Sequence, residues 1–291
     1  MVLLLLIIYK FNGQNLLLEA HKLAIDAAMQ PLKEKSEEAS GLTIYEGKNI
    51  FFAGLVFLAF SAQGQEKTIS LDRSFDKIIV SPHIAAEFVQ GEKSSIAVES
   101  ITEPIEKFQY ELKNGTLHVY LEGAKTWTEN KKEKRNGWKK KTPIYKNTVA
   151  KVTITYVDVN TFSVRGEEKI SFNSPLQQEK FTLRIYGESE VTIKEAILQD
   201  LRVAIYGESD LTLEKGSIKK QRITAYGESN VRSVDVQSSE AKITAYGDGT
   251  FQFNVSERLK VTSYGEANIL YKGNPEIKKG IVIGDATISR I

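Results

Sequence analysis

Acidic residues recur at a nearly constant spacing in the second half of the chain. They belong to a repeated Tyr-Gly-Glu-Ser marker and its variants, at Glu188, Glu208, Glu228, Asp248, Glu266 and Asp285. Carboxylate oxygens are preferred ligands of Ca²⁺, and two carboxyl groups about 5 Å apart can hydrolyse a glycosidic bond. The column could therefore bind Ca²⁺ or a cationic partner, act on a glycan, or form a solvated edge.

The repetition itself argues against catalysis. A glycosidase needs two acids in different environments so that one of them stays protonated, whereas each acid here has nearly the same neighbours as the next. The Gly-Gly-x-Gly-x-Asp spacing of calcium-binding rolls is also missing. We assign no catalytic residue and no required cofactor. Ca²⁺ on the acidic column is kept as a hypothesis, and a carbohydrate-active β-helix enzyme, either a polysaccharide lyase or a glycosidase, as the alternative function.

Tyrosines precede the acids by two residues in the same marker. They are Tyr186, Tyr206, Tyr226, Tyr246 and Tyr264. If the repeats stack in register, these side chains form an external aromatic ladder. Such a ladder could contact sugar rings or a partner surface, because tyrosine combines a flat apolar ring with a polar tip. It could equally stabilise neighbouring repeats, as aromatic pairs between strands do.

Glycines define the repeat that must position these columns. They are Gly166, Gly187, Gly207, Gly227, Gly247, Gly265 and Gly284, with short alternating strands on both sides. So short a unit cannot enclose a core alone, but one unit per turn buries a continuous interior. We predict an all-β fold in which residues 160–291 form a single-stranded, right-handed parallel β-helix with coils of about 20 residues. The glycines would form one corner, where positive φ is easiest for glycine.

Residues 66–159 are predicted to be an irregular β region continuous with the solenoid. Strands are expected at 77–80, 84–90, 94–99, 108–112 and 116–121, and Asn114-Gly115 predicts a hairpin turn. Residues 123–148 are rich in lysine and contain Trp127 and Trp138, which predicts a basic loop. This loop could contact acidic glycans, lipid headgroups or nucleic acid, or it could simply be solvated.

Composition excludes several function classes. The 39 Lys and Arg against 37 Asp and Glu give a net charge of +2, and there is no cysteine. No overall field attracts nucleic acid or an anionic membrane, so no nucleic-acid partner is expected. Disulfides and cysteine chemistry are ruled out. His83 and His118 show no metal-ligand spacing, and the alternation around His118 predicts an ordinary outward-facing strand residue.

The N-terminal segment resembles a displaced export signal. Residues 50–62 are apolar, Lys48 precedes them, and Ala62-Gln63-Gly64 provides small residues for a cut after Gly64. As a helix this run spans about 20 Å, short of the roughly 30 Å of a bilayer core, so no stable membrane span is expected. We predict a signal peptide at 48–64. Residues 1–47 would then be an upstream extension from a misassigned start, or alternatively a genuine cytoplasmic extension.

Two further motifs connect the repeats to a known family. With the repeated glycine corners behind a signal peptide, Phe75-Asp76-Lys77-Ile78 and Asn114-Gly115-Thr116-Leu117 resemble the putative auto-transporter adhesin, head GIN domain family, over about residues 70–290. The chain departs from it by having Tyr-Gly-Glu-Ser where the family more often has Gly-Ser-Gly. The resemblance implies an exported β-helical domain of Gram-negative bacteria with an adhesive role and no assigned catalytic residue.

The sequence as a whole therefore predicts a non-catalytic adhesin-like or scaffolding protein. It would be periplasmic, associated with the outer membrane or on the cell surface. Its expected partner is a glycan or a cell-surface protein.

Overall fold

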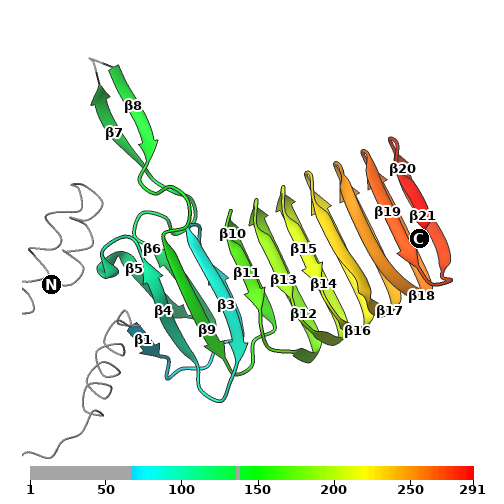
Figure 1. Ribbon diagram of the computed structural model, residues 1–291, viewed down its shortest axis with the longest axis horizontal. Coiled ribbons are helices and arrows are strands. Elements are labelled where there is room, and N and C mark those ends of the chain that lie inside the picture. The colour runs from blue at the N-terminus through cyan, green and yellow to red at the C-terminus, as the bar shows by residue number, and fades with distance from the viewer. Residues whose placement is uncertain (1–66, 136–137) are drawn as a thin grey trace, which may run out of the picture. The chain divides into compact units, whose positions relative to one another are not determined.

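The computed structural model describes residues 67–135 and 138–291, and these are almost entirely β-structure (Figure 1). In these ranges there is one 3₁₀ turn, Ile105–Lys107, and no helix long and apolar enough to cross a membrane. The predicted upstream extension and signal peptide lie outside the described residues.

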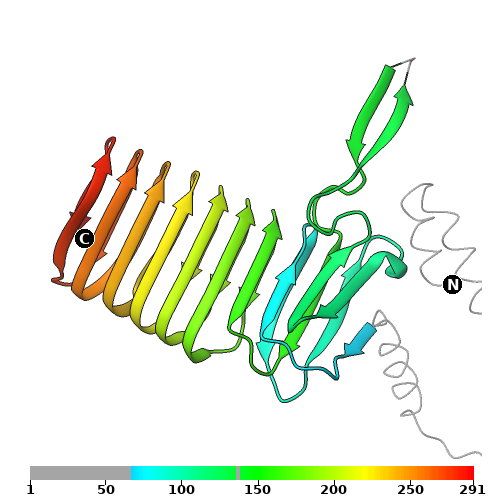
Figure 2. The ribbon, with the colours of Figure 1, turned by 180° about the vertical axis from the view of Figure 1, so that it is seen from behind.

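The second half of the chain is a parallel β-solenoid, as predicted (Figure 2). Each coil has a long strand, a corner and a second, short strand or strand segment. Equivalent residues of successive coils lie opposite one another, so that Tyr206 pairs with both Tyr186 and Tyr226. The strands are β10 (Thr161–Gly166), β11 (Lys169–Phe172), β12 (Leu176–Gly187), β13 (Glu190–Ile193), β14 (Ala196–Gly207), β15 (Asp210–Leu213), β16 (Gly216–Tyr226), β17 (Asn230–Tyr246), β18 (Gly249–Tyr264), β19 (Ala267–Lys272), β20 (Glu276–Ile283) and β21 (Thr287–Arg290).

The core runs through the middle of the coils. Apolar side chains alternate along each strand, so residues such as Leu183 and Ile185 are buried while their neighbours face out. Large aromatic side chains fill the first coils, where Phe88 stacks on Phe172 with a centroid distance of 4.8 Å. One continuous core links the solenoid with the N-terminal β region.

The glycine corner has a clear steric cause. Gly227 has a φ of +106°, and a Cβ at this position would lie 2.7 Å from the carbonyl oxygen of Gly207 in the preceding coil. Adjacent corners thus approach too closely for a side chain, in a conformation that only glycine adopts readily. All seven glycines of the repeated marker have a positive φ.

The solenoid begins earlier in the chain than residue 160. Strands β2 (Lys77–Val80) and β3 (Ile84–Gln90) pair in parallel with β10 and β11 and form an additional coil. Its corner contains Pro82 and His83 instead of the glycine marker, and His83 adopts a φ of +69°. The sequence does not reveal this coil, because its corner lacks the glycine that marks the other coils.

Antiparallel strands cover the N-terminal end of the solenoid. They are β1 (Lys67–Ser70), β4 (Ser95–Ile101), β5 (Phe108–Lys113), β6 (Thr116–Leu121) and β9 (Ala150–Tyr156). β4 pairs antiparallel with β1 and β9, while β6 and β9 also continue the parallel stack onto β2 and β3. β5 and β6 form the predicted hairpin, with positive φ at both Asn114 and Gly115. This cap protects the edge of the first coil.

The predicted basic loop is instead an antiparallel hairpin, β7 (Asn130–Arg135) and β8 (Trp138–Pro143), which projects from the cap (Figure 1). Lys131, Lys132, Lys140 and Lys141 are exposed. The sequence does not predict these strands, because they carry no apolar alternation and lysine is uncommon in strands.

Candidate functional site: the ladders at the glycine corner

The four positions of the Tyr-Gly-Glu-Ser marker have four different environments. Tyr206 lies on the outer surface at the end of β14, and Gly207 makes the corner. Glu208 points to solvent, and Ser209 is buried. Because the coils stack in register, each position becomes a column along the solenoid.

The predicted tyrosine ladder is present. Successive rings from Tyr186 to Tyr264 have centroid distances of 4.8–5.0 Å and interplanar angles of 2–6°. Tyr206, Tyr226 and Tyr246 are nevertheless 39–41% exposed. Because each ring face covers the next, the ladder offers a row of ring edges and hydroxyls, not open faces on which sugars could stack. Arg165 lies over Tyr186 at the N-terminal end of the ladder.

A buried serine column secures the corner from inside. The hydroxyl of Ser209 donates to the carbonyl oxygen of Gly187 at 2.8 Å, and Ser189 and Ser229 make the equivalent bonds at 2.9 and 3.0 Å. These bonds satisfy carbonyl groups of the preceding corner. This role was not predicted, although serine recurs in three copies of the marker.

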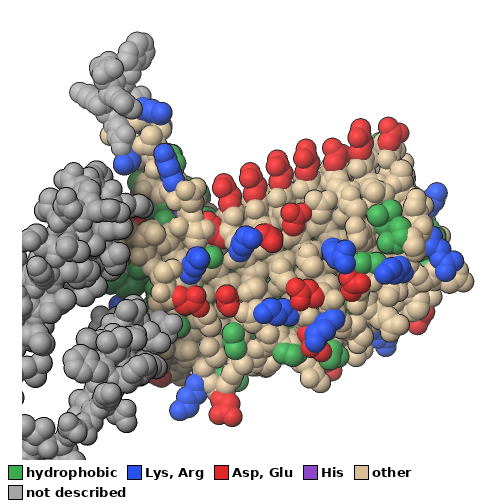
Figure 3. Space-filling view, viewed as in Figure 1, with side chains coloured by type: hydrophobic (Ala, Val, Ile, Leu, Met, Phe, Trp, Pro, Cys, Tyr) green, Lys and Arg blue, Asp and Glu red, His purple; other side chains and the backbone are tan. Residues whose placement is uncertain are grey.

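The acidic column is exposed along one edge of the solenoid (Figure 3). Glu188, Glu208 and Glu228 form no ion pair with the described residues. Asp248 accepts a hydrogen bond from the backbone N–H of Glu266 at 3.0 Å. In residues 67–135 and 138–291, no group of three or more His, Asp or Glu side chains could hold a metal ion. Ca²⁺ binding by this column stays a prediction.

A basic column crosses the same sheet as the tyrosines. It consists of Arg202, Arg222, Lys242, Lys260 and Lys278, each directly opposite the next. On β14, β16, β17 and β18 its residue lies four positions before the tyrosine, and β20, which has no tyrosine, adds the last member. Asp200 pairs with both arginines, and Glu276 lies 3.4 Å from Lys278. This column was not predicted, although the same repeat period places its residues opposite one another.

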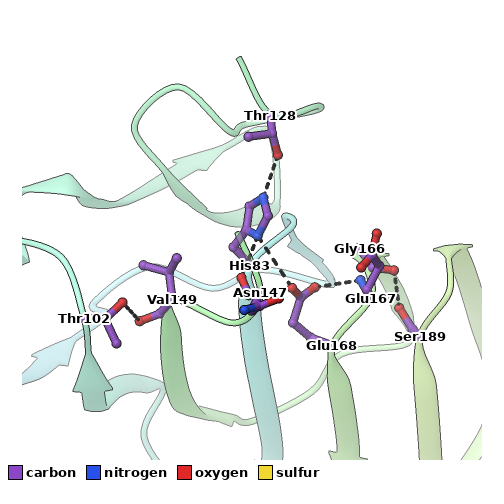
Figure 4. A network of polar contacts seen from close by, with 9 residues as sticks. All are labelled: His83, Thr102, Thr128, Asn147, Val149, Gly166, Glu167, Glu168 and Ser189. Atoms are coloured by element: carbon purple, nitrogen blue, oxygen red, sulfur yellow. Dashed lines mark hydrogen bonds and ion pairs between the residues drawn. The ribbon is translucent and has the colours of Figure 1, made fainter. Parts of the chain in front are cut away.

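His83 joins the base of the β7–β8 hairpin to the solenoid (Figure 4). Its Nδ1 donates to the carbonyl oxygen of Asn147 at 2.7 Å, and its Nε2 lies 2.6 Å from the hydroxyl of Thr128. Glu168, only 4% exposed, lies 3.9 Å from Nδ1 and accepts a hydrogen bond from the backbone N–H of Glu167. Burial raises the pKa of Glu168 to about 7.

His118 lies on the outward face of β6, between the buried Leu117 and Val119, but it is half-buried and hydrogen-bonded there. Its Nε2 lies 2.8 Å from the hydroxyl of Ser81, and that hydroxyl donates to the carbonyl oxygen of Lys125 at 2.5 Å. Burial, with help from Lys125 and Arg165, lowers the pKa of His118 to about 4. Ser81 is fully buried and its proton is directed away from the histidine. The pair therefore does not fit an activated nucleophile and its base.

Comparison with known families assigns the chain. The model of the family "Putative auto-transporter adhesin, head GIN domain" matches residues 74–275. The chain belongs to this family. The match covers the cap after β1 and the solenoid through β19 of this head GIN domain, in agreement with the resemblance seen in its sequence. A search of curated proteins found no match.

Solved structures share the fold of this head GIN domain. A putative adhesin from Bacteroides fragilis is 22% identical with a TM-score of 0.61, and the match covers 79% of this chain and 99% of that one. A putative adhesin from Parabacteroides merdae is 18% identical with a TM-score of 0.58, covering 79% and 97%. A putative lipid binding protein from Parabacteroides distasonis is 17% identical with a TM-score of 0.56, covering 78% and 97%.

Proposed function

We propose that this head GIN domain is an exported, non-catalytic recognition module of the cell envelope. It acts as an adhesin that contacts a glycan or a cell-surface protein with the edge formed by the tyrosine ladder. Family membership supports the adhesive role, and the residues at the corner support the location of the contact.

The observation that carries this proposal is the ladder of parallel rings from Tyr186 to Tyr264. Exposed tyrosine is favoured at recognition surfaces because it gives a large contact area with a polar tip at low entropic cost. Here stacking already fixes the rings, so the tyrosine side chains would lose little additional conformational entropy when a partner binds. The row of edges and hydroxyls suits hydrogen bonding along an extended partner.

The enzyme alternative receives no comparable support. The acids of the corner column repeat in equivalent surroundings. Glu168 has a raised pKa, but it is buried at the junction with His83. A catalytic acid has to reach its substrate.

A glycan array and a panel of cell-surface proteins test the proposed contact. The variant Tyr206→Ala/Tyr226→Ala/Tyr246→Ala should lose binding under conditions where its unfolding curve shows that it is folded. Binding of Ca²⁺ to wild type is titrated in parallel. A second variant replaces the same three residues by Phe, which keeps the stacking and removes the hydroxyls, so binding should be weakened while the coils keep their stability. If the Ala variant binds every ligand as wild type does, the ladder only stabilises the coils.

Export requires its own test. Fractionation of the native cells should place the protein outside the cytoplasm, with a mature N-terminus directly after Gly64. Peptides from residues 10–40 in the mature protein would contradict both the predicted cleavage and the misassigned start.

A further inference from the structure

An open groove of about 630 Å³ lies on a third side of the solenoid, after the short strands. It crosses four strands, β14, β16, β17 and β18, and reaches the turn after β19. On each of these four strands the groove residues lie seven to ten positions before the tyrosine of the ladder. The groove is therefore a binding surface distinct from the ladder, and its length follows the stacking direction of the coils.

The lining of the groove is almost free of charge. Lys219 is its one charged residue, although 26% of all residues in the chain are charged. Ser217, Gln237 and Asn254 form an outward column in which each residue lies opposite the next. Their side chains make no hydrogen bond to other described residues, so their amide and hydroxyl groups are available to a ligand.

The groove lies where the stacking of the strands is irregular. The pairing of β17 with β18 shifts register between Ser233 and Gln237 and again between Ser238 and Glu240. Such irregularities bend a strand and redirect its side chains. At the start of the outward column, Ile197 is 41% exposed and adds an apolar surface next to the polar groups.

The surroundings of the groove restrict what can bind there. Its strands pair on both sides, so a polypeptide could not add itself as a further strand through main-chain hydrogen bonds. A ligand must instead be held by side chains. Amide and hydroxyl groups both donate and accept hydrogen bonds, which matches the hydroxyls of a sugar. Ile197 can contact the apolar face of a sugar ring.

We infer that this groove binds an extended, neutral polysaccharide. A neutral ligand fits because the groove has only one cationic side chain to attract an acidic polymer. The basic column from Arg202 to Lys278 has five and would bind such a polymer better. An extended ligand fits because the polar groups repeat once per coil, about 4.8 Å apart, close to the length of one sugar unit. The site is independent of the tyrosine ladder and does not rest on it.

The test measures binding of the full protein to dextran, mannan and soluble β-glucan, with alginate as the acidic comparison. At least one neutral polysaccharide should bind, with an affinity that is unchanged by added salt. The double variant Gln237→Ala/Asn254→Ala should weaken that binding by about tenfold or more, because it removes two sets of hydrogen bonds. The matched control Gln252→Ala changes an outward glutamine of β18 outside the groove and should leave binding unchanged.

Unfolding curves of Gln237→Ala/Asn254→Ala and of Gln252→Ala show whether each variant is folded under the binding conditions. The inference is overturned if no neutral polysaccharide binds, if only alginate binds, or if the double variant binds as wild type does. If polysaccharide binding is lost in the tyrosine variant but kept in the groove variant, the ladder is the binding site and the inference about the groove is wrong. If binding is lost only in the groove variant, the groove is the binding site and the ladder is not.

Discussion

Nδ1 of His83 lies 3.9 Å from Oε1 of Glu168, where the hairpin base meets the first solenoid coils. Burial raises the pKa of Glu168 from an ordinary 4.5 to about 7. The folded state therefore holds a proton that the unfolded state releases between these two values. Since folding binds this proton, raising the pH from about 4.5 to about 7 should lower the free energy of unfolding, by up to about 3 kcal/mol.

Replacing Glu168 by Gln tests this pH dependence. The amide keeps an acceptor for the N–H of Glu167 and cannot ionise. Above pH 7 the variant should be more stable than wild type, and near pH 4.5 the two should be similar. Denaturant unfolding across this range measures the effect. Glu208→Gln, which changes an exposed acid of the corner column, serves as the control and should keep the wild-type profile. The same profile for Glu168→Gln would contradict the prediction.

His118 should remain neutral in mildly acidic solution. Its pKa is lowered from 6.5 to about 4, first by burial and then by the charge of Lys125. For a lowered histidine pKa, the stabilising contribution is present above pH 6.5 and is lost as the pH falls toward 4. NMR titration of the ring, assigned with His118→Asn, measures this directly. A midpoint near 6.5 would show that the ring is more solvated than in the structure.

A side chain at the corner should destabilise the solenoid. Gly227→Ala places a Cβ 2.7 Å from the carbonyl oxygen of Gly207 at a φ of +106°. We expect a loss of about 1–3 kcal/mol in the free energy of unfolding. Gly91→Ala is the control, because its φ is not positive and its Cβ meets the movable methyl group of Thr155. Equal losses in both variants would contradict a special role of the corner.

The position of a tyrosine in the ladder should set the cost of removing it. Tyr226 stacks on Tyr206 and Tyr246, whereas Tyr264 stacks on Tyr246 alone. Tyr226→Ala should cost about 1–3 kcal/mol beyond the lost buried area, and Tyr264→Ala about half as much. Tyr226→Phe keeps the rings and should be nearly neutral. Thermal unfolding gives the comparison, and equal losses at both positions would show that stacking contributes little.

Reversing one charge in the basic column should stabilise the protein. Lys260 lies directly between Lys242 and Lys278. Like charges on neighbouring strands repel, so Lys260→Glu should raise the free energy of unfolding by about 0.2–1 kcal/mol. The gain should shrink in high salt, since these side chains are exposed. Lys260→Gln is the control and should give about half the gain in the free energy of unfolding. If Lys260→Glu lowers the free energy of unfolding, repulsion between the lysines of the column is weak.

The sequence by itself was enough for the repeating part of the fold. Each coil repeats the same alternation and the same corner, and parallel stacking places like residues over like. A period read along the chain therefore becomes a column in space. For this reason the buried face, the glycine corner and the tyrosine ladder could all be predicted from residue spacing, and so could the Asn114-Gly115 turn, whose conformation is local.

Only the tertiary structure decided the features that lie outside this period. His83 contacts Thr128 and Asn147, which are 45 and 64 residues away, and no spacing in the sequence relates them. The additional first coil has a histidine at its corner where the other coils have glycine. Even within the repeat, the sequence placed the tyrosines in a column but could not show that their ring faces cover one another. Such features depend on side-chain orientation and on contacts between distant segments, which appear only when the whole chain is packed.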